Sequence, residues 1–387
     1  MILKKLYKSI LIIACIFTVF SSNLTGQEEK KGNFKHSFTT FHLEARAELD
    51  YLGSYTMKPA FDGFNTQYYY HWDDNHYGFH GKYFNFLLGG NIGDHISYFI
   101  RQRIIPKPGT VNLFDNTDFL YLQYRFNKNW SLRVGKEALY IGGFEYDAPP
   151  IDVYFQTNFW SQIYCFHVGV SGTYTDNSGK NKLTFQFANS PYIYYTGEGN
   201  EWTKGLFSYN LFWNGNFDWF STLYSVNLVE YERGKFINYI SLGNKFTFNK
   251  WQFYIDYMNR AVSFDKFFND FTVVGRLDWK VCNSVNLFAK AGYDQNFAED
   301  RLVLHGKDMM MTPGAQYYFY GLGVEIRPLK YQDLRIHAFV ANNTLRYPEY
   351  ISPVDIYAPL MKFSTLNVNV GATWRINFLN FLPDKLK

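Results

Sequence analysis

The stretch LNVNVGATWRINF at residues 366–378 alternates apolar and polar residues along its whole length. Successive side chains of a β-strand point to opposite sides, so this stretch predicts a strand with one apolar face and one polar face. The apolar face would carry Leu366, Val368, Val370, Ala372, Trp374, Ile376 and Phe378. A soluble β-sandwich could account for one or two such strands, but the same alternation recurs along the chain.

Charged residues indicate which face meets water. Nine stretches alternate clearly, and seventeen of their charged residues share one parity. The basic ones are Arg46, Arg101, Arg103, Arg125, Arg133, Arg276, Lys280, Lys290, Arg327, Arg335 and Arg375, and the acidic ones are Glu44, Glu48, Asp50, Asp278, Asp294 and Glu325. A Lys or Arg facing lipid at mid-bilayer would cost about 2–4 kcal/mol. We therefore predict a membrane barrel with a hydrated, charged lumen and with Leu43, Leu322, Val368 and Val370 facing lipid.

Turn signals divide the chain into sixteen predicted strands. They are residues 40–52, 78–92, 95–105, 119–126, 130–136, 164–174, 181–189, 205–213, 217–229, 236–247, 250–260, 270–281, 285–297, 315–327, 333–342 and 365–378. Connections after even-numbered strands are short, and most of those after odd-numbered strands are long, as in barrels with short periplasmic turns and longer outer loops. The first long loop is predicted at 53–77. The expected fold is all-β, a single transmembrane antiparallel β-barrel of sixteen strands.

The N-terminal residues predict export. Lys4, Lys5 and Lys8 precede an apolar run at 10–20, which is too short to span a bilayer as a helix and is typical of a signal peptide. Loss of these lysines lowers the formal net charge from +4 to about +1, which argues against nucleic-acid binding. The predicted organisation is a cleaved signal peptide at 1–26, a polar tail at 27–38, the barrel at 39–378 and a short tail at 379–387.

The basic excess of the polar face has two interpretations. Rings of Arg and Lys favour anions in a pore, and Arg101, Arg103, Arg125 and Arg133 form a run of cations with no acid in their predicted strands. Alternatively, lumen charges pair across strands and stiffen the wall, as the alternation Glu44-Arg46-Glu48 suggests. Both interpretations stay open. Cys165 and Cys282 are predicted at opposite ends of the barrel, too far apart for a disulfide.

No cofactor, metal site or catalytic residue is predicted. His71, His76 and His80 lie near Asp73 and Asp74, but their spacing matches no defined metal site. No catalytic motif is present, which argues against an outer-membrane barrel enzyme such as a lipase or protease. A surface receptor or adhesin acting through its outer loops is the other alternative, although the loops are too short to form separate domains.

Short motifs in a fixed order give the chain a family resemblance. They are Phe41-His42-Leu43-Glu44-Ala45-Arg46, Val134-Gly135-Lys136-Glu137, Gly142-Gly143-Phe144-Glu145 and the final Gly371–Phe378 strand. Together with a signal peptide and sixteen strands, these motifs resemble the phosphate-selective porin O and P family, especially its members from Bacteroides-like bacteria. The resemblance covers nearly the whole mature chain.

The resemblance implies a homotrimeric channel in the outer membrane of a bacterial cell, surrounded by outer-membrane lipid and lipopolysaccharide. Its third outer loop, here Glu137–Ile163, would fold into the lumen and form a constriction with Glu145, Asp147 and Asp152. This loop contains no Lys or Arg, unlike the basic constriction of the better-known members. We expect passive diffusion of small hydrophilic solutes or ions with a mild anion bias and uptake of phosphate or oligophosphate. The arginine wall would face the loop acids.

Overall fold

A computed structural model gives the structure of the chain. It describes residues 36–62, 65–105, 113–163, 165–192, 205–264, 267–296, 303–304, 307–308, 314–329, 333–346 and 362–381. The predicted signal peptide lies outside these residues. No helix in the described segments is long and apolar enough to cross a membrane.

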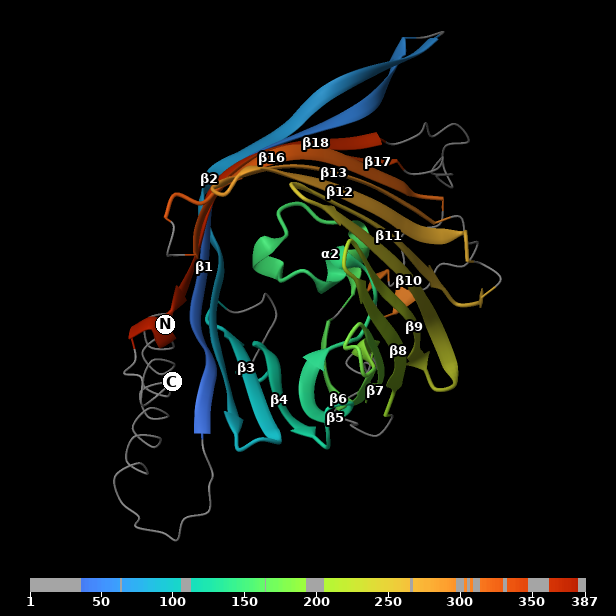
Figure 1. Ribbon diagram of the computed structural model, residues 1–387. Coiled ribbons are helices and arrows are strands. Elements are labelled where there is room, and N and C mark those ends of the chain that lie inside the picture. Colours follow the sequence, from blue (N-terminus) through green and yellow to red (C-terminus); the bar gives the residue numbers. More distant parts are fainter. Residues whose placement is uncertain are drawn as a thin grey trace. The chain divides into compact units, whose positions relative to one another are not determined.

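Sixteen strands form one closed antiparallel barrel, which confirms the predicted fold and strand number (Figure 1). They are β1 (His36–Asp62), β2 (Asn65–Ile92), β3 (Ile96–Arg103), β4 (Thr117–Arg125), β5 (Trp130–Ala138), β6 (Phe166–Thr175), β7 (Asn181–Asn189), β8 (Phe207–Phe217), β9 (Phe220–Glu232), β10 (Lys235–Phe248), β11 (Trp251–Ala261), β12 (Asp270–Cys282), β13 (Val285–Asn296), β16 (Gln316–Ile326), β17 (Asp333–Arg346) and β18 (Lys362–Asn377). A separate two-stranded sheet joins β14 (Val303–Leu304) to β15 (Lys307–Asp308).

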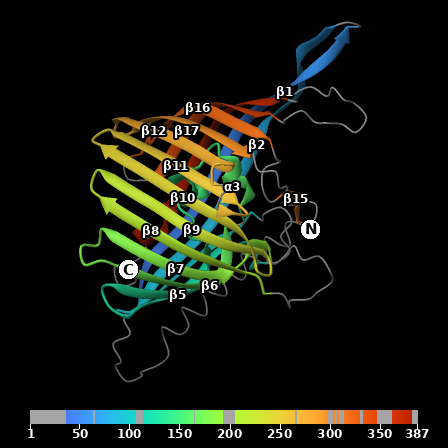
Figure 2. The same ribbon diagram turned by 90° about the vertical axis from the view of Figure 1, so that its right-hand side faces the viewer.

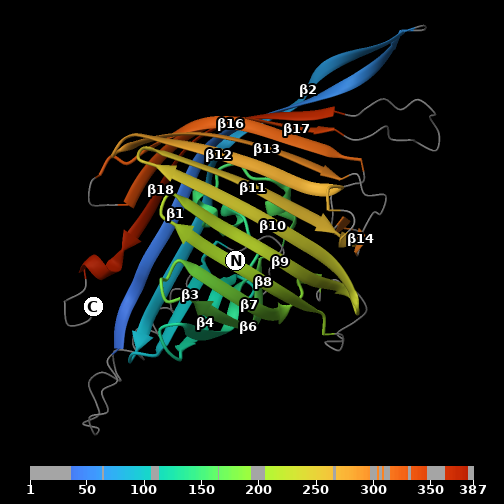
Figure 3. The same ribbon diagram turned by 45° about the vertical axis from the view of Figure 1, so that its right-hand side comes forward.

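The first and last strands close the barrel. β1 pairs with β18 from His42 opposite Asn377 to Met57 opposite Lys362, and the two strands run side by side in Figure 3. Each strand of the barrel wall therefore has a neighbour on both sides, which a structure in lipid requires because no water is present to satisfy open edges.

The alternation of the sequence becomes the two faces of the barrel wall. Leu322 is 66% exposed and Val370 is 48% exposed, whereas Arg46 is 1% exposed. The apolar parity thus faces outward and the charged parity faces inward, as predicted. No disulfide joins Cys165 and Cys282 in the structure, and that the two stay unpaired remains a prediction.

Lys136 departs from this rule. It follows Val134 on the outward parity of β5, yet its side chain is buried. Its Nζ donates a hydrogen bond of 2.7 Å to the carbonyl of Phe114 and lies 4.6 Å from the centre of that ring. The segment before β4 thus covers the amine, and the neighbouring Gly135 has a φ of +139°, which L side chains rarely adopt.

The outer connection predicted at 53–77 is wrong in detail. Here β1 and β2 continue as a paired hairpin from Met57 opposite Tyr70 to Asp62 opposite Asn65. The hairpin extends beyond the neighbouring strands (Figure 2, blue). The neighbouring strands β18 and β3 end before the tip of this hairpin, so its last residues pair only with each other. A local alternation pattern could not reveal a two-stranded extension without a third strand.

Candidate functional site

The connection between β5 and β6 folds into the ring of strands. This inner loop (residues 139–163) contains α2 (Phe144–Asp147), the 3-10 turn η1 (Pro150–Asp152) and α3 (Asn158–Gln162). Figure 1 shows α2 within the ring of strands. Hydrogen bonds join it to β9 through Gly142, to β11 through Glu145 and to β16 through Tyr154. The loop therefore crosses the lumen to the opposite wall.

The inner loop shares an apolar core with that wall. Leu139, Ile141, Tyr154, Phe155 and Phe159 are buried against inward-facing apolar residues of the strands. The wall contributes Val229, Ile237, Met258, Val274, Phe288, Phe319, Phe339 and Ala341. The inward face of β9–β17, which we call the docking wall, is therefore partly dry. The expected hydrated lumen does not extend to this part of the wall, because the loop covers the apolar inward residues.

Glycines allow the loop backbone to approach the docking wall closely. A Cβ atom on Gly142 would lie 2.5 Å from the Leu223 carbonyl oxygen, and one on Gly243 would lie 2.8 Å from the Cα of Gly143. Gly143 itself has a φ of +99°, a conformation that L side chains rarely adopt. The Gly142-Gly143-Phe144-Glu145 motif is thus a docking sequence.

Glu145 anchors the loop on β13. Its carboxylate is buried and pairs with Lys290, which also donates to the carbonyl of Phe155 at 2.5 Å. The same carboxylate accepts a 2.5 Å hydrogen bond from the hydroxyl of Thr157, and the Glu145 amide donates to Asp256 at 2.8 Å. Two predicted site residues, Glu145 and Lys290, therefore meet, but as a structural ion pair.

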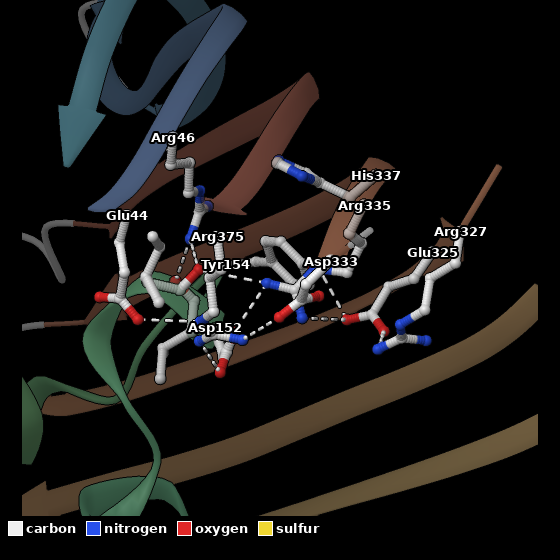
Figure 4. A network of polar contacts seen from close by, with 12 residues as sticks. Glu44, Arg46, Asp152, Tyr154, Glu325, Arg327, Asp333, Arg335, His337 and Arg375 are labelled. Atoms are coloured by element: carbon white, nitrogen blue, oxygen red, sulfur yellow. Dashed lines mark hydrogen bonds and ion pairs between the residues drawn. The ribbon is translucent and has the colours of Figure 1, made fainter. Parts of the chain in front are cut away.

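Asp152 forms a second anchor on β17 and β18 (Figure 4). It accepts from Arg335 at 2.5 Å and from Arg375 at 2.7 Å. Burial opposes its charge, but the two guanidinium groups prevail and lower the pKa of the Asp152 carboxyl below its ordinary value. Arg46 of β1 adds hydrogen bonds to the carbonyls of Ile151 and Val153, at 3.1 and 2.9 Å. The loop is thus held from two further sides.

The inward face of β3–β6, which we call the cationic wall, carries compensated arginines. Asp118 lies 2.8 Å from the Nε of Arg103 and 3.5 Å from that of Arg101. Glu137 lies 2.9 Å from Arg133. The interpretation of an arginine run without an acid is therefore wrong. Asp118 was missed because β4 begins at Thr117, before the predicted start at residue 119.

The loop acids also do not all face this wall, contrary to expectation. Glu145 and Asp152 point to the docking side, as their partners show. Asp147 remains beside the open space. Burial raises the pKa of the Asp147 carboxyl above its ordinary value, and Lys245 only partly offsets this effect. Among the residues that the structure describes, Asp147 is therefore the one acid of the predicted constriction that forms no ion pair.

Two cavities border the inner loop, and Asp147, Ala148 and Pro149 line both. The first cavity, of about 700 Å³, follows the cationic wall. Its charged lining residues are Arg101, Arg125, Lys128, Arg133, Glu137, Asp147 and Lys182. The second, of about 680 Å³, lies along the turn ends of β10–β17, where its basic residues also outnumber its acids. Its charged residues are Asp147, Asp152, Lys245, Lys250, Arg276, Asp278, Lys280, Lys290, Glu325, Arg327 and Arg335.

Partners divide the predicted pore residues into two groups. Arg276 pairs with Asp278 at 2.7 Å, so it joins the compensated set. Arg125 and Lys280 have no acid partner in the described part of the chain. Lys128 and Lys182, which sequence analysis did not single out, resemble Arg125 in this respect and line the same cavity. Lys128 lies in the turn before β5 and Lys182 is the second residue of β7, so neither belongs to the clearly alternating stretches.

A family model described as phosphate-selective porin O and P matches residues 60–268. No curated protein matches the sequence. Among solved structures, an anion-selective porin from Comamonas acidovorans is similar, with a TM-score of 0.56 and 12% identity over 88% of this chain and 100% of that chain.

Two further solved structures share the architecture. The outer membrane channel DcaP of Acinetobacter baumannii has a TM-score of 0.54 and 11% identity, covering 90% of this chain and 99% of that chain. The trimer form of OmpT, an outer membrane protein of Vibrio cholerae, has a TM-score of 0.52 and 14% identity, covering 88% and 99% respectively. At these identities the similarity establishes the fold.

Proposed function

This chain belongs to the phosphate-selective porin O and P family and is a passive channel of the bacterial outer membrane, and we propose that its solutes cross along the cationic wall. The family and fold indicate a channel rather than an enzyme. The proposed path is the cavity between the inner loop and β3–β8, and the proposed cargo is small anions, including phosphate, together with small hydrophilic solutes.

The extent of the first cavity is the main support for this path. It is lined by Asn127 and Trp130 at the turn ends of the strands and by Arg101, Ala138 and Phe166 near their loop ends. The cavity therefore runs along the height of the wall. On the docking wall, by contrast, a buried apolar core fills the contact between the loop and the strands, and the second cavity lies towards the turn ends.

The proposed anion bias rests on uncompensated charge. Arg125, Lys128 and Lys182 line the cavity and are exposed, and no acid pairs with them among the described residues. Basic residues lining a pore raise the local concentration of anions. The guanidinium groups of Arg101, Arg103 and Arg133 already hold carboxylates. We therefore propose fast, weakly selective diffusion in place of tight phosphate binding, which needs free bidentate donors.

Reversal potentials in planar bilayers with asymmetric KCl test this function. The triple variant Arg125→Gln, Lys128→Gln and Lys182→Gln should lower the anion-to-cation permeability ratio severalfold, while single-channel conductance persists. Lys235→Gln is a matched control, because Lys235 pairs with Glu232 on an exposed hairpin away from the cavity. An unchanged ratio in the triple variant would remove the first cavity from the conducting path.

The same bilayer measurements distinguish free diffusion of phosphate from binding of phosphate in the channel. Under the proposal, phosphate carries current without saturating and does not block chloride. Saturable block of the chloride current by micromolar phosphate would contradict weak selectivity and favour a phosphate-binding site.

We propose a homotrimer in the membrane. Support comes from the family and from the trimer form described for the Vibrio cholerae protein of similar fold. The outward face offers a continuous apolar surface, with Leu122 at 59% and Leu322 at 66% exposure, to lipid or to a neighbouring copy. Native mass spectrometry in mild detergent should give three copies, and a monomer in several detergents would count against the proposal.

A further inference from the structure

Three potential metal ligands meet on the inward face of β1 and β2. Glu48 lies directly opposite His80 in the strand pairing, and Asp50 lies two residues further along β1. The Nε2 atom of His80 is 3.1 Å from Asp50 Oδ2 and 3.4 Å from Glu48 Oε2. One ligand atom from each of the three residues falls within 4.8 Å of the other two. The sequence did not reveal this group, because its members come from two strands.

These separations suit a small ion. Zn²⁺ binds nitrogen and oxygen ligands at about 2.0–2.2 Å, so neighbouring ligands of a tetrahedral site lie roughly 3.4 Å apart. The two measured distances from His80 are close to this value. A single imidazole with two carboxylates favours a transition metal over Ca²⁺ or Mg²⁺, which prefer oxygen ligands alone.

A buried, unsatisfied oxygen points into the group. The side chain of Glu48 is fully buried, and its Oε2 atom accepts no hydrogen bond within the described structure. Leaving a buried carboxylate oxygen without a hydrogen bond is costly. Lys82 stands 3.5 Å from this atom but is 38% exposed, so it can leave without breaking a buried contact.

Neighbouring side chains hold the two carboxylates in place. Arg46 pairs with Glu48, and the amide of Asn369 donates to Asp50. His337 Nε2 lies 3.4 Å from Glu48 Oε1. It reaches across Gly371, where a Cβ atom would come within 2.6 Å of the imidazole. Such supporting contacts orient metal ligands and typically change affinity by about 10–100-fold when removed.

We propose that Glu48, Asp50 and His80 bind one divalent transition-metal ion of the Zn²⁺ type on the inner wall. The His80 side chain is 42% exposed, so an ion can enter from the lumen. Zn²⁺ displaces the Lys82 amine from Glu48, and water completes the coordination. The ion then links β1 to β2 near the base of their extended hairpin.

Isothermal titration of the purified, chelator-treated full-length protein with ZnCl₂ tests the proposal. Wild type should bind one ion per chain. His80→Ala should weaken that binding at least tenfold, and Asn369→Ala should weaken it by about tenfold. Lys82→Gln should strengthen it severalfold, because the competing charge is gone. His95→Ala is the matched control, since His95 is an exposed histidine on the turn before β3 and should bind as wild type.

Several outcomes would overturn the site. Equal Zn²⁺ affinity in wild type and His80→Ala would do so, as would weaker binding in Lys82→Gln. Displacement of Zn²⁺ by equimolar Ca²⁺ would contradict the assignment to a transition metal. Lys82→Gln also guards against misfolding as an explanation, because a damaged barrel cannot gain affinity.

Discussion

The docking wall and the cationic wall use the same alternating strands for opposite purposes. On the docking wall the inward positions include Phe288, Phe319 and Phe339, and the inner loop packs on them. On the cationic wall they include Arg101 and Arg133, held by acids and bordered by open space. Both sets satisfy the requirement of a lipid-facing apolar parity. The identity of the inward residues, which lipid does not constrain, decides whether the lumen is filled or open.

The difference also lies in how charge is used. The docking wall buries its ion pairs under the loop, as with Lys290 and Glu145. Buried pairs contribute little net stability, but losing one partner leaves a costly uncompensated charge. The cationic wall and the adjoining strand β7 keep their surplus positive charge at exposed turn ends, at Arg125, Lys128 and Lys182. Position relative to the loop thus separates structural charges from those available to solutes.

Lys290→Ala should have the largest effect on the docking wall. It leaves the buried Glu145 carboxylate uncompensated, which should destabilise the docked loop by about 3–5 kcal/mol. The freed loop should raise conductance noise and expose the loop to protease. Lys235→Ala, which removes an exposed pair worth at most about 1 kcal/mol, is the control. The double variant Lys290→Met with Glu145→Gln should restore much of the protection, and equal sensitivity of single and double variants would contradict the anchor.

Steric contact gives the next largest effect. Gly243→Val places a side chain against Gly143 and should destabilise docking by about 1–3 kcal/mol through overpacking. The same change at Gly275 is the control, because the nearest atom to its Cβ would be Tyr254 O at an ordinary 3.5 Å. Single-channel conductance should become heterogeneous only in Gly243→Val. A uniform wild-type conductance in both variants would show that the loop does not need this close approach.

On the cationic wall, the pairing of arginines with acids predicts a smaller effect, on ion selectivity. Removing a whole pair, with Arg103→Gln and Asp118→Asn, leaves the net charge of the wall unchanged and should leave the reversal potential unchanged. Arg125→Gln removes one unpaired charge and should shift the reversal potential measurably towards cations. The two variants are compared in the same KCl gradient. A larger shift from the paired substitution would assign the selectivity to Arg103.

Lowering the pH should have the smallest effect on the difference between the two walls. The raised pKa of Asp147 means that this carboxylate takes up a proton at a higher pH than a carboxyl group with an ordinary pKa of about 3.9. Its lost negative charge increases the positive excess of both cavities, so anion preference should rise as the pH falls. Asp152, whose pKa is lowered, stays ionised further into the acid range and keeps the loop docked. Asp147→Asn should show no such early rise, which reversal potentials against pH will reveal.

The sequence predicted those features that local patterns control. Alternation and turn signals together located all sixteen barrel strands, and the position of charge oriented residues such as Arg46 and Val370 correctly. The entry of the loop into the lumen came from family resemblance alone. The residues that this loop contacts were not predicted, because Gly142 meets Leu223 and Glu145 meets Lys290 across long separations in the chain. No residue-level period records which inward side chains a distant loop will cover.

Errors in the site have the same origin. The alternation pattern treated every inward charge as equally wet, so it could not separate Arg103, which holds Asp118, from Arg125, which holds no acid in the described segments. It also missed Asp118, which lies just before the predicted strand 119–126, and Lys128, which lies in the turn after that strand. Strand ends escape the period-two rule because turns and covering segments, as at Lys136, change what each side chain meets.

Closure of the ring by β1 and β18 has a consequence for assembly. Leu43 pairs with Ile376, so the first and last strands must find each other after almost the whole chain has been made. Such a contact has a high loop-closure entropy and makes folding slow. Until it forms, both edges carry unpaired amides and carbonyls that hydrocarbon cannot solvate. A chain that lost β18 would therefore lack a stable intermediate in the membrane, and insertion becomes a cooperative event that only the complete barrel can finish.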